Sequence, residues 1–259
     1  MATNSSGATP PETFDYEEYQ HHLDLVRTYG PTALFMDRVI RKVSASFKGL
    51  DVLDLGCGTG HLSRMLEREN RVVSYDPAFE GVRVTRERRR TRGGFVVGGG
   101  EHLPFRDESY DAILLIDVLE HIADDAAVAR EATRVLRPGG RVLCMVPENQ
   151  ALYSRTDAAN GHLRRYHRDE LVRIFRPCEP ETLFDYGFPF MRLYLNVLGR
   201  VHDAVVPQAK PVGVKRAALR AASATLNGLF SLDLLFAGWF RGVEIVAVFR
   251  KPGGVPSAR

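Results

Sequence analysis

Short apolar runs alternate with amphipathic segments between residues 51 and 147. The apolar runs are rich in Val, Ile and Leu, as strands buried on both faces are. The segments between them carry apolar residues at helical spacing. The expected strands are VLDL, VVSYD, FVVG, YDAILLID and RVLCMVP, and the expected helices are 61–70, 79–91 and DDAAVAREATRVL, which RPGG ends. This order predicts an α/β fold with a parallel sheet between two helical layers.

The flanking regions break this rhythm. Residues 1–14 have neither a basic start nor an apolar run, so we expect a disordered tail and no signal peptide. After the last of these strands we expect a polar loop, a short helix DELVRIF capped by Asp169, and a strand ETLFDYGF. The predicted organisation is one domain over 15–259, with N-terminal helices (15–48), a core (51–187), a helical cap (188–240) and a final strand (243–251).

Composition and charge narrow the class of protein. Hydrophobic residues make up 44% of the 259 residues, which is enough for a buried core. The net charge is +3, and six arginines fall within 83–92, so that run is either a solvated helix face or a nucleic-acid contact. Cys57, Cys144 and Cys178 form no CxxC pair, so we expect neither a zinc site nor a disulfide framework. A reducing, cytoplasmic setting fits this cysteine usage.

The stretch VLDLGCGTGHLSRML leads from the first strand through three glycines into a helix. A dinucleotide-binding turn needs G-x-G-x-x-G. Gly56 and Gly58 fit that pattern, but the third position is His61, and Gly60 comes one residue early. The match to a dinucleotide site is therefore weak. The turn still lets a ligand lie against the main chain, because no Cβ stands in the way.

The pattern VLDLGCGTG closely resembles the first motif of class I methyltransferases that use S-adenosylmethionine (SAM). The resemblance continues in order through VVSYDPAF, GGGEHLPFRDESYDAILLIDVLEHI and REATRVLRPGGRVLCMVPE, and covers 52–148. The chain is most similar to a branch with ubiquinone-pathway O-methyltransferases and other small-molecule methyltransferases. The resemblance implies a Rossmann-like seven-stranded sheet, mostly parallel with an antiparallel last strand. It also implies SAM as methyl donor and S-adenosylhomocysteine (SAH) as product.

The same resemblance assigns SAM to the carboxyl ends of the first strands. Asp76 ends the second strand and supplies a carboxylate for both ribose hydroxyls. Gly99 or Gly100 stands where relatives carry an aspartate for the adenine amino group, so this contact shifts to Glu101 or to backbone groups. The expected cofactor-binding set is Asp54, Gly56, Cys57, Gly58, Gly60, Asp76, Glu101, His102, Asp117 and Val118.

Two histidines are candidates for the chemistry of transfer. His121 follows the fourth strand and His162 lies in the loop after the fifth, and histidine suits proton abstraction from a hydroxyl acceptor near neutral pH. Asp117, Glu120, His121 and His162 also resemble the E-x-x-E-H…H divalent-metal set of small-RNA 3′-end methyltransferases, part of which ubiquinone-pathway enzymes share. A histidine base, a metal ion and simple positioning of the acceptor are the three alternatives.

Four further residues are candidates for contacts with the acceptor. The stretch GHLRRYHRDEL resembles a G-H-x-R-x-[YF] signature of one branch of these enzymes. There, Arg164 and Arg165 either meet a carboxylate or phosphate of the acceptor or tie the loop to the sheet edge. His167 lies in the same loop, and Tyr16 either closes over the cofactor or packs against the sheet.

Together these residues favour a SAM-dependent methyltransferase of a small or medium-sized organic acceptor, with a hydroxyl preferred over nitrogen or carbon. The cap is expected to build an apolar acceptor pocket. The alternatives are an N- or C-methyltransferase of a natural product or peptide, an RNA-end methyltransferase and a non-catalytic SAM-binding protein. Residues 190–240 also allow contact with a membrane surface, although 223–240 is marginal as a membrane span. A small-molecule partner is favoured over nucleic acid and membrane.

Overall fold

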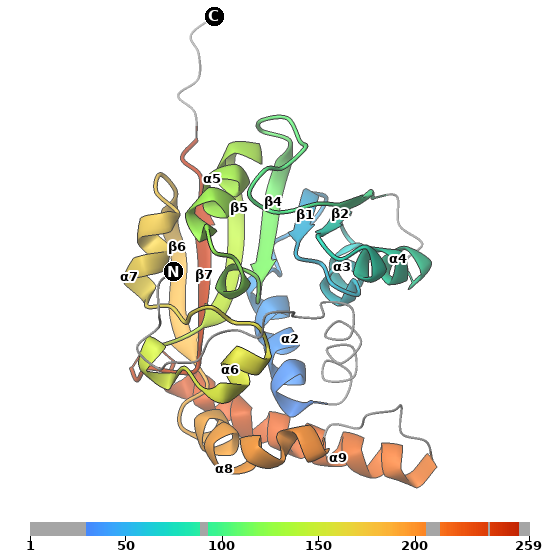
Figure 1. The fold of residues 1–259 in the computed structure, drawn as a ribbon, viewed down its shortest axis with the longest axis vertical. Coiled ribbons are helices and arrows are strands. Elements are labelled where there is room, and N and C mark those ends of the chain that lie inside the picture. Colours follow the sequence, from blue (N-terminus) through green and yellow to red (C-terminus); the bar gives the residue numbers. More distant parts are fainter. Residues whose placement is uncertain (1–29, 89–92, 206–212, 238, 254–259) are drawn as a thin grey trace, which may run out of the picture.

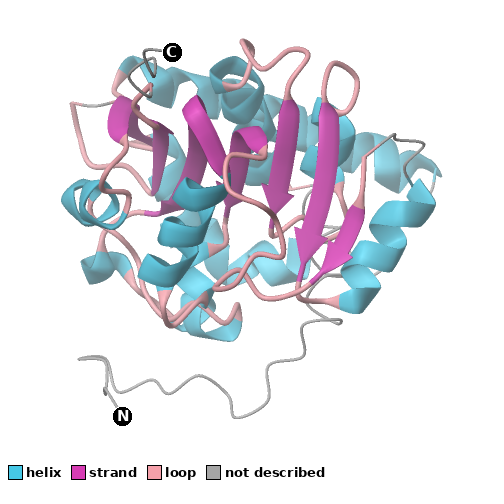
Figure 2. Cartoon of the chain, turned by 90° about the horizontal axis from the view of Figure 1, so that it is seen from above, coloured by secondary structure: helices cyan, strands magenta, loops and turns pink. Residues whose placement is uncertain are grey.

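The computed structural model describes residues 30–88, 93–205, 213–237 and 239–253. In this part of the chain, seven strands form one sheet in the order β3-β2-β1-β4-β5-β7-β6, with helices on both faces (Figure 2). The strands are β1 (Asp51–Leu55), β2 (Arg71–Asp76), β3 (Phe95–Val97), β4 (Tyr110–Ile116), β5 (Leu136–Pro147), β6 (Glu179–Tyr186) and β7 (Glu244–Arg250). β7 runs antiparallel to β5 and β6, and the predicted antiparallel last strand is thereby confirmed.

One described helix precedes β1, and the other described helices lie in the connections between strands (Figure 1). The α-helices are α2 (Pro31–Val43), α3 (His61–Leu66), α4 (Phe79–Arg88), α5 (Asp125–Val135), α6 (Arg155–Ala159), α7 (Arg168–Ile174), α8 (Phe190–Val205) and α9 (Gly213–Phe230). Three 3₁₀ turns are η1 (Leu119–His121), η2 (Gln150–Leu152) and η3 (Ser231–Leu235).

Both faces of the sheet are buried, which explains the unbroken apolar strands. In β4, Ile113 and Leu115 pack into a core shared with α5 and α7. The intervening Ala112, Leu114 and Ile116 pack into a second core shared with α2 and α3. Successive side chains of a strand point to opposite faces, so a strand between two helical layers needs apolar residues at every position.

The strand order places a crevice between β1 and β4. From β1 the chain proceeds outward to β2 and β3, and it then returns to β4 on the other side of β1. Ligands bind outside the carboxyl ends of strands at such a switch point, because neighbouring connections leave in opposite directions there. The fold therefore predicts a ligand site at the carboxyl ends of β1 and β4.

The helix expected over 61–70 is shorter in the structure and ends at Leu66. The side chain of Asn70 explains the early end. Its amide donates to the carbonyls of Phe47 and Leu66, and its carbonyl accepts from the N–H of Leu50. These bonds form a turn into β2.

The predicted helical segment before α2 and the last arginines of 83–92 lie outside the described residues.

The region expected to be a polar loop after β5 contains η2 and α6. Ser154 starts α6 because its N–H donates to the Asp157 carboxylate while its hydroxyl accepts from the Asp157 N–H.

The prediction that Asp169 caps α7 was wrong. His167 is the N-cap residue and donates its N–H to Glu170 Oε2. Asp169 lies within the first turn.

The segment predicted as a cap contains α8, α9 and η3. Figure 1 shows α8 and α9 below the sheet, near α2 and on the side where β4 ends. An aromatic cluster joins them to the sheet: Phe35 contacts Tyr186 and Phe230 at 5.3 and 6.2 Å between ring centroids, and Tyr194 contacts Phe230 at 5.4 Å. None of the described helices is both long enough and apolar enough to cross a membrane.

A buried carboxylate holds the start of α8. The two oxygens of Asp233 in η3 accept hydrogen bonds of 2.9 Å from the N–H groups of Phe190 and Met191. The first N–H groups of a helix have no partner within it, so Asp233 satisfies two of them from a distant part of the chain. This contact couples η3 to α8.

We expect Asp233→Ala to lower the free energy of unfolding by roughly 2 kcal/mol, because two buried N–H groups lose their acceptor. Urea denaturation followed by circular dichroism measures the loss. The matched control is Asp169→Ala, whose side chain is 79% exposed, with an expected change within about 0.5 kcal/mol. Equal effects of the two substitutions would contradict this role for Asp233.

Candidate functional site

The turn after β1 is built almost entirely of backbone. Gly56, Gly58 and Gly60 have φ of +83°, +50° and +74°, conformations that side chains with a Cβ rarely adopt. A Cβ on Gly56 would lie 2.3 Å from Cγ2 of Val118. The N–H groups of Gly56 and Cys57 donate to the carbonyl of Tyr75, at 2.8 and 3.0 Å. The turn is therefore tight, fixed to β2 and open to a ligand only along its main chain.

Asp76 braces this turn from the end of β2. Its side chain is 2% exposed, and its oxygens accept from the N–H groups of Gly58 (2.8 Å) and Ala78 (2.9 Å). Burial raises the pKa of Asp76, and the two backbone hydrogen bonds oppose that rise. A carboxylate has about four acceptor positions, so two such bonds leave capacity for hydroxyl groups of a ligand.

A cavity of about 290 Å³ lies at the ends of β1, β2 and β4. Most of its wall comes from the glycine turn, the residues after β2 and β3, and η1 with the segment around it. The lining residues are Leu55, Gly56, Cys57, Gly58, Thr59, Asp76, Pro77, Gly98, Gly99, Gly100, Glu101, Ile116, Asp117, Val118, His121, Ile122 and Ala123. This is the crevice that the strand order predicts.

Seven of the ten residues expected to bind the cofactor line this cavity, and three do not. Asp54 is buried beneath the turn and accepts a hydrogen bond from the Ser63 hydroxyl. Gly60 packs against Thr85, where a Cβ would come within 2.3 Å. His102 is exposed on the surface beside the cavity. These residues can act on the site only through the turn or the neighbouring loop.

Seven lining residues were not expected from the sequence, namely Leu55, Thr59, Pro77, Gly98, Ile116, Ile122 and Ala123. Each follows or ends a strand within a few positions of a residue that was expected. Gly98 has a specific reason to be glycine, because a Cβ there would lie 2.2 Å from the Tyr75 hydroxyl oxygen. That hydroxyl donates to the Gly99 carbonyl at 2.9 Å. Their proximity to the strand ends is the feature of the sequence that could have predicted that these residues line the cavity.

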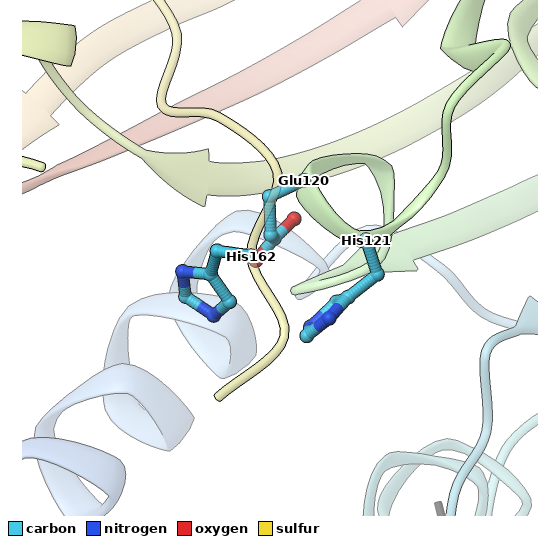
Figure 3. Close-up of side chains that lie close together, drawn as sticks. All are labelled: Glu120, His121 and His162. Carbon is cyan, nitrogen blue, oxygen red and sulfur yellow. The ribbon is translucent and has the colours of Figure 1, made fainter. Parts of the chain in front are cut away.

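His121 lies in η1 and is one of the residues that line the cavity. Figure 3 shows it close to Glu120 and His162. The Nδ1 of His121 is 3.3 Å from the Gly161 carbonyl oxygen. Burial, and secondarily the nearby His162, lower the pKa of His121 to about 4. The imidazole is therefore neutral near pH 7. A proton on Nδ1 that donates to Gly161 leaves the lone pair on Nε2.

His162 is next to His121 but does not line the cavity. The two ring centroids are 4.8 Å apart, and the rings are perpendicular. His162 Nδ1 lies 3.2 Å from Asp157 Oδ1. Although burial acts to raise the pKa of Asp157, the bonds from His162 and Arg165 hold that pKa well below its usual range. Asp157 is thus a buried anion that orients the His162 ring.

Glu120 completes a compact group with these two histidines. One potential ligand atom from each of Glu120, His121 and His162 lies within 4.8 Å of the others (Figure 3). Both carboxylate oxygens of Glu120 are buried and have no hydrogen-bond partner among the described residues. Burial, and then the charge of Asp117, raise the pKa of Glu120 well above its usual value. Asp117, the fourth expected ligand, lies outside this group and lines the cavity.

The two arginines after His162 make internal contacts. Arg164 pairs with Asp125 at 3.0 Å and donates to the Ala123 carbonyl. Arg165 pairs with Asp157 at 2.8 Å and donates to the Glu148 carbonyl. These contacts tie the loop to the start of α5, to α6 and to the residue after β5.

The last two acceptor candidates lie elsewhere. His167 has its Nδ1 3.3 Å from Nη1 of Arg241 and does not line the cavity. Tyr16 lies outside the described residues. The acceptor side of the site is consequently defined here by His121 and the residues around it.

Comparisons with known proteins agree on the family. Residues 53–144 match the family model described as a methyltransferase domain. The chain is 31% identical to the demethylmenaquinone methyltransferase of Thermotoga maritima, and the match covers 68% of this chain and 87% of that protein. It is 31% identical to phthiotriol/phenolphthiotriol dimycocerosates methyltransferase 1 of Mycobacterium ulcerans over 59% of this chain, and the match spans 61% of that relative's length.

A solved structure shows the same fold. Phospholethanolamine N-methyltransferase 2 of Haemonchus contortus, bound to phosphomonomethylethanolamine and SAH, superposes with a TM-score of 0.58 at 18% identity. The superposition covers 93% of this chain and 61% of that one. At this identity the likeness concerns the fold.

We expect Gly56→Ala to weaken SAH binding at least about tenfold, because the new Cβ forces either Val118 or the turn to move. Titration calorimetry measures the affinity. Gly139→Ala is the matched control: Gly139 has φ +78° but nothing within 4 Å of its added Cβ, so it shares the backbone strain without touching the cavity.

The double variant Gly56→Ala, Val118→Ala removes the side chain that the new Cβ meets, and we expect it to recover part of the affinity. A folded Gly56→Ala protein with wild-type SAH affinity would show that the cofactor does not lie against this turn.

Proposed function

The chain belongs to the class I SAM-dependent methyltransferase family, and we propose that it transfers the methyl group of SAM to a hydroxyl oxygen of a small or medium-sized organic acceptor. One observation carries the proposal: a single cavity brings together the glycine turn, the Asp76 carboxylate and the neutral imidazole of His121. The first two suit an adenosyl cofactor, and the third suits an acceptor that must lose a proton.

In this proposal the cofactor lies along the turn with its ribose at Asp76. The main chain of Gly56–Gly58 allows close approach, and Asp76 accepts from the ribose hydroxyls with the acceptor positions its backbone bonds leave unused. The adenine lies toward Gly99, Gly100 and Glu101, which form the neighbouring wall. The sulfonium end then faces η1, where His121 stands.

Methyl transfer is an in-line displacement at carbon, so positioning and exclusion of water do most of the work. The acceptor hydroxyl becomes strongly acidic as its oxygen bonds to the methyl carbon. A weak base therefore suffices, and an imidazole with a pKa of about 4 stays unprotonated and ready to accept that proton. The Gly161 carbonyl fixes the orientation of the ring.

The experiment that tests the function supplies SAM with a labelled methyl group and a panel of phenols and alcohols. Demethylmenaquinone in its reduced, hydroxyl-bearing form and phthiotriol dimycocerosates belong in the panel, because the names of two relatives contain demethylmenaquinone and these lipids. Label on oxygen supports the proposal. Label only on carbon or nitrogen would replace the hydroxyl by another acceptor, and SAH binding without transfer to any acceptor would favour a non-catalytic role.

We expect His121→Ala to lower kcat about 100-fold or more, while SAH affinity stays close to wild type, because the variant loses the proton acceptor but keeps the turn. His102→Ala is the control, since His102 is exposed and outside the cavity. Initial rates and calorimetry measure the two quantities. Full turnover by His121→Ala would leave positioning alone as the catalytic device.

A divalent metal ion at Glu120, His121 and His162 is a second candidate, and the unpartnered carboxylate of Glu120 favours it. The residues fit such an ion: two imidazoles and one carboxylate suit Mn²⁺, Fe²⁺ or Zn²⁺. The Nδ1 atoms of His121 and His162 lie near Gly161 and Asp157, as the outer partners of metal-bound histidines do. When bound, the ion would supply polarisation of the acceptor hydroxyl.

We expect the protein to bind Mn²⁺ in calorimetry, and Glu120→Gln to bind it at least about tenfold more weakly, because the amide keeps the volume but loses the charge. Glu148→Gln is the matched control, since Glu148 is also buried with an unpartnered oxygen but lies outside the group. Absence of Mn²⁺, Fe²⁺ and Zn²⁺ binding, with activity unchanged by a chelator, would end this candidate.

A further inference from the structure

Most exposed large hydrophobic side chains of the described residues gather on α8, α9 and the segment after them. Ten such side chains are exposed, and eight of them lie between residues 193 and 240. We call these eight residues the C-terminal apolar surface: Leu193, Leu195, Val197, Leu229, Leu232, Leu235, Trp239 and Phe240. Monomeric proteins that stay in water rarely gather exposed apolar residues in this way, so the surface indicates a binding partner.

The exposed side chains of this surface do not contribute to the hydrophobic core. On α8, Met191 and Tyr194 point inward and pack with the sheet, while Leu193 and Val197 are exposed one turn apart. In η3, Leu234 packs against the core, and Leu232 and Leu235 on either side of it are exposed. The segment is therefore apolar on its outward side as well as its inward side, and the fold itself does not require the outward residues.

The charge of this region of the sequence and two described arginines beside the surface indicate the kind of partner. The sequence of 190–241 contains seven Lys or Arg and two Asp. One of these, Asp233, is buried and bonded to backbone N–H groups. Two exposed arginines border the surface: Arg38 donates to Ser231 in η3, and Arg241 follows Phe240. Apolar residues next to basic ones match an anionic lipid surface, because burial of apolar area and attraction to the anionic headgroups both favour binding there.

The aromatic residues at its end fit the same partner. Trp239 is 83% exposed, and the neighbouring Phe240 packs against Phe188 at 5.2 Å between ring centroids. Tryptophan prefers the boundary between headgroups and hydrocarbon, because its ring is apolar and its N–H is polar. The described helices include none that could span a bilayer.

We propose that the C-terminal apolar surface docks this protein on the face of an anionic phospholipid bilayer. Helices α8 and α9 lie on the side of the molecule where β4 ends (Figure 1), and residues at the ends of β1, β2 and β4 line the cavity. The consequence for the acceptor rests on the proposed function: a lipophilic hydroxyl compound could reach the cavity from the bilayer without crossing water. The docking itself does not depend on catalysis.

The chain contains a single tryptophan, so Trp239 reports on the proposed contact without engineering. We expect its emission to shift to the blue when the full-length protein meets vesicles of equal parts phosphatidylglycerol and phosphatidylcholine. Vesicles of phosphatidylcholine alone should give a much smaller shift, and salt should weaken the anionic response. Co-sedimentation of the protein with the same vesicles gives the partition coefficient.

Two variants test whether vesicle binding depends on this surface or on exposed apolar residues anywhere on the protein. Leu232→Ser with Leu235→Ser keeps Trp239, and we expect about tenfold weaker partitioning because two apolar side chains no longer enter the interface. Phe79→Ser is the matched control, since Phe79 is 65% exposed on α4, away from this surface; it should partition like wild type. Circular dichroism and SAH binding confirm that both variants fold.

Three results would overturn the proposal. The first is an emission maximum already typical of a buried indole in the free protein and unchanged by anionic vesicles, which means that the chain or a second copy covers the surface. The second is a dimer in sedimentation that the double variant converts to a monomer, with no vesicle binding by wild type. The third is equal partitioning of the double variant and wild type. No acceptor or SAM enters these measurements, so their failure leaves the proposed methyl transfer untouched.

Discussion

The hydrogen bonds from Gly58 and Ala78 to the Asp76 carboxylate hold the site together. They join the turn after β1 to the turn after β2, so two connections that leave the sheet separately become one wall. The glycines could adopt many other conformations, and the carboxylate selects one of them. Burial makes the ionised form of Asp76 costly, and the two N–H donors compensate. A ligand that adds hydroxyl donors would stabilise the same ionised form further.

Behind the cavity lies a second electrostatic constraint. Asp117, Glu120 and Glu244 are close enough that Asp117 raises the pKa of both buried glutamates, after the larger effect of burial, while Arg165 opposes the rise in each. Arg165 is itself paired with Asp157. A buried glutamate is stabilised when it holds a proton or when a cation binds beside it. Both carboxylate oxygens of Glu120 and Oε2 of Glu244 are buried and have no hydrogen-bond partner among the described residues.

The sequence predicted the fold, and seven of the ten residues expected to bind the cofactor line the cavity, because both depend on local patterns. The positions and burial of the core strands follow from apolar periodicity. The seven-stranded sheet, its antiparallel last strand, and the roles expected of Gly56 and Asp76 follow from the resemblance to a methyltransferase family. Contacts between distant segments were harder. Nothing near Arg165 in the sequence indicates that it pairs with Asp157. Likewise, a hydrogen bond between His167 and Glu170 makes His167 the N-cap residue of α7. Asp169 is the more common cap by residue type, but it lies within the helix.

The cap illustrates a different limit of sequence reasoning. The apolar residues of 188–240 predicted a pocket for the acceptor, yet no described residue of this segment lines the cavity. Periodicity indicates that a helix has an apolar side, but it does not tell whether that side faces a core, a ligand or another phase. Exposure decides between them: Phe230 is buried against Phe35 and Tyr194, while Leu235 is 72% exposed. Apolar area left in water is unfavourable in proportion to its extent, so a surface of this kind is best explained by a partner that removes the water.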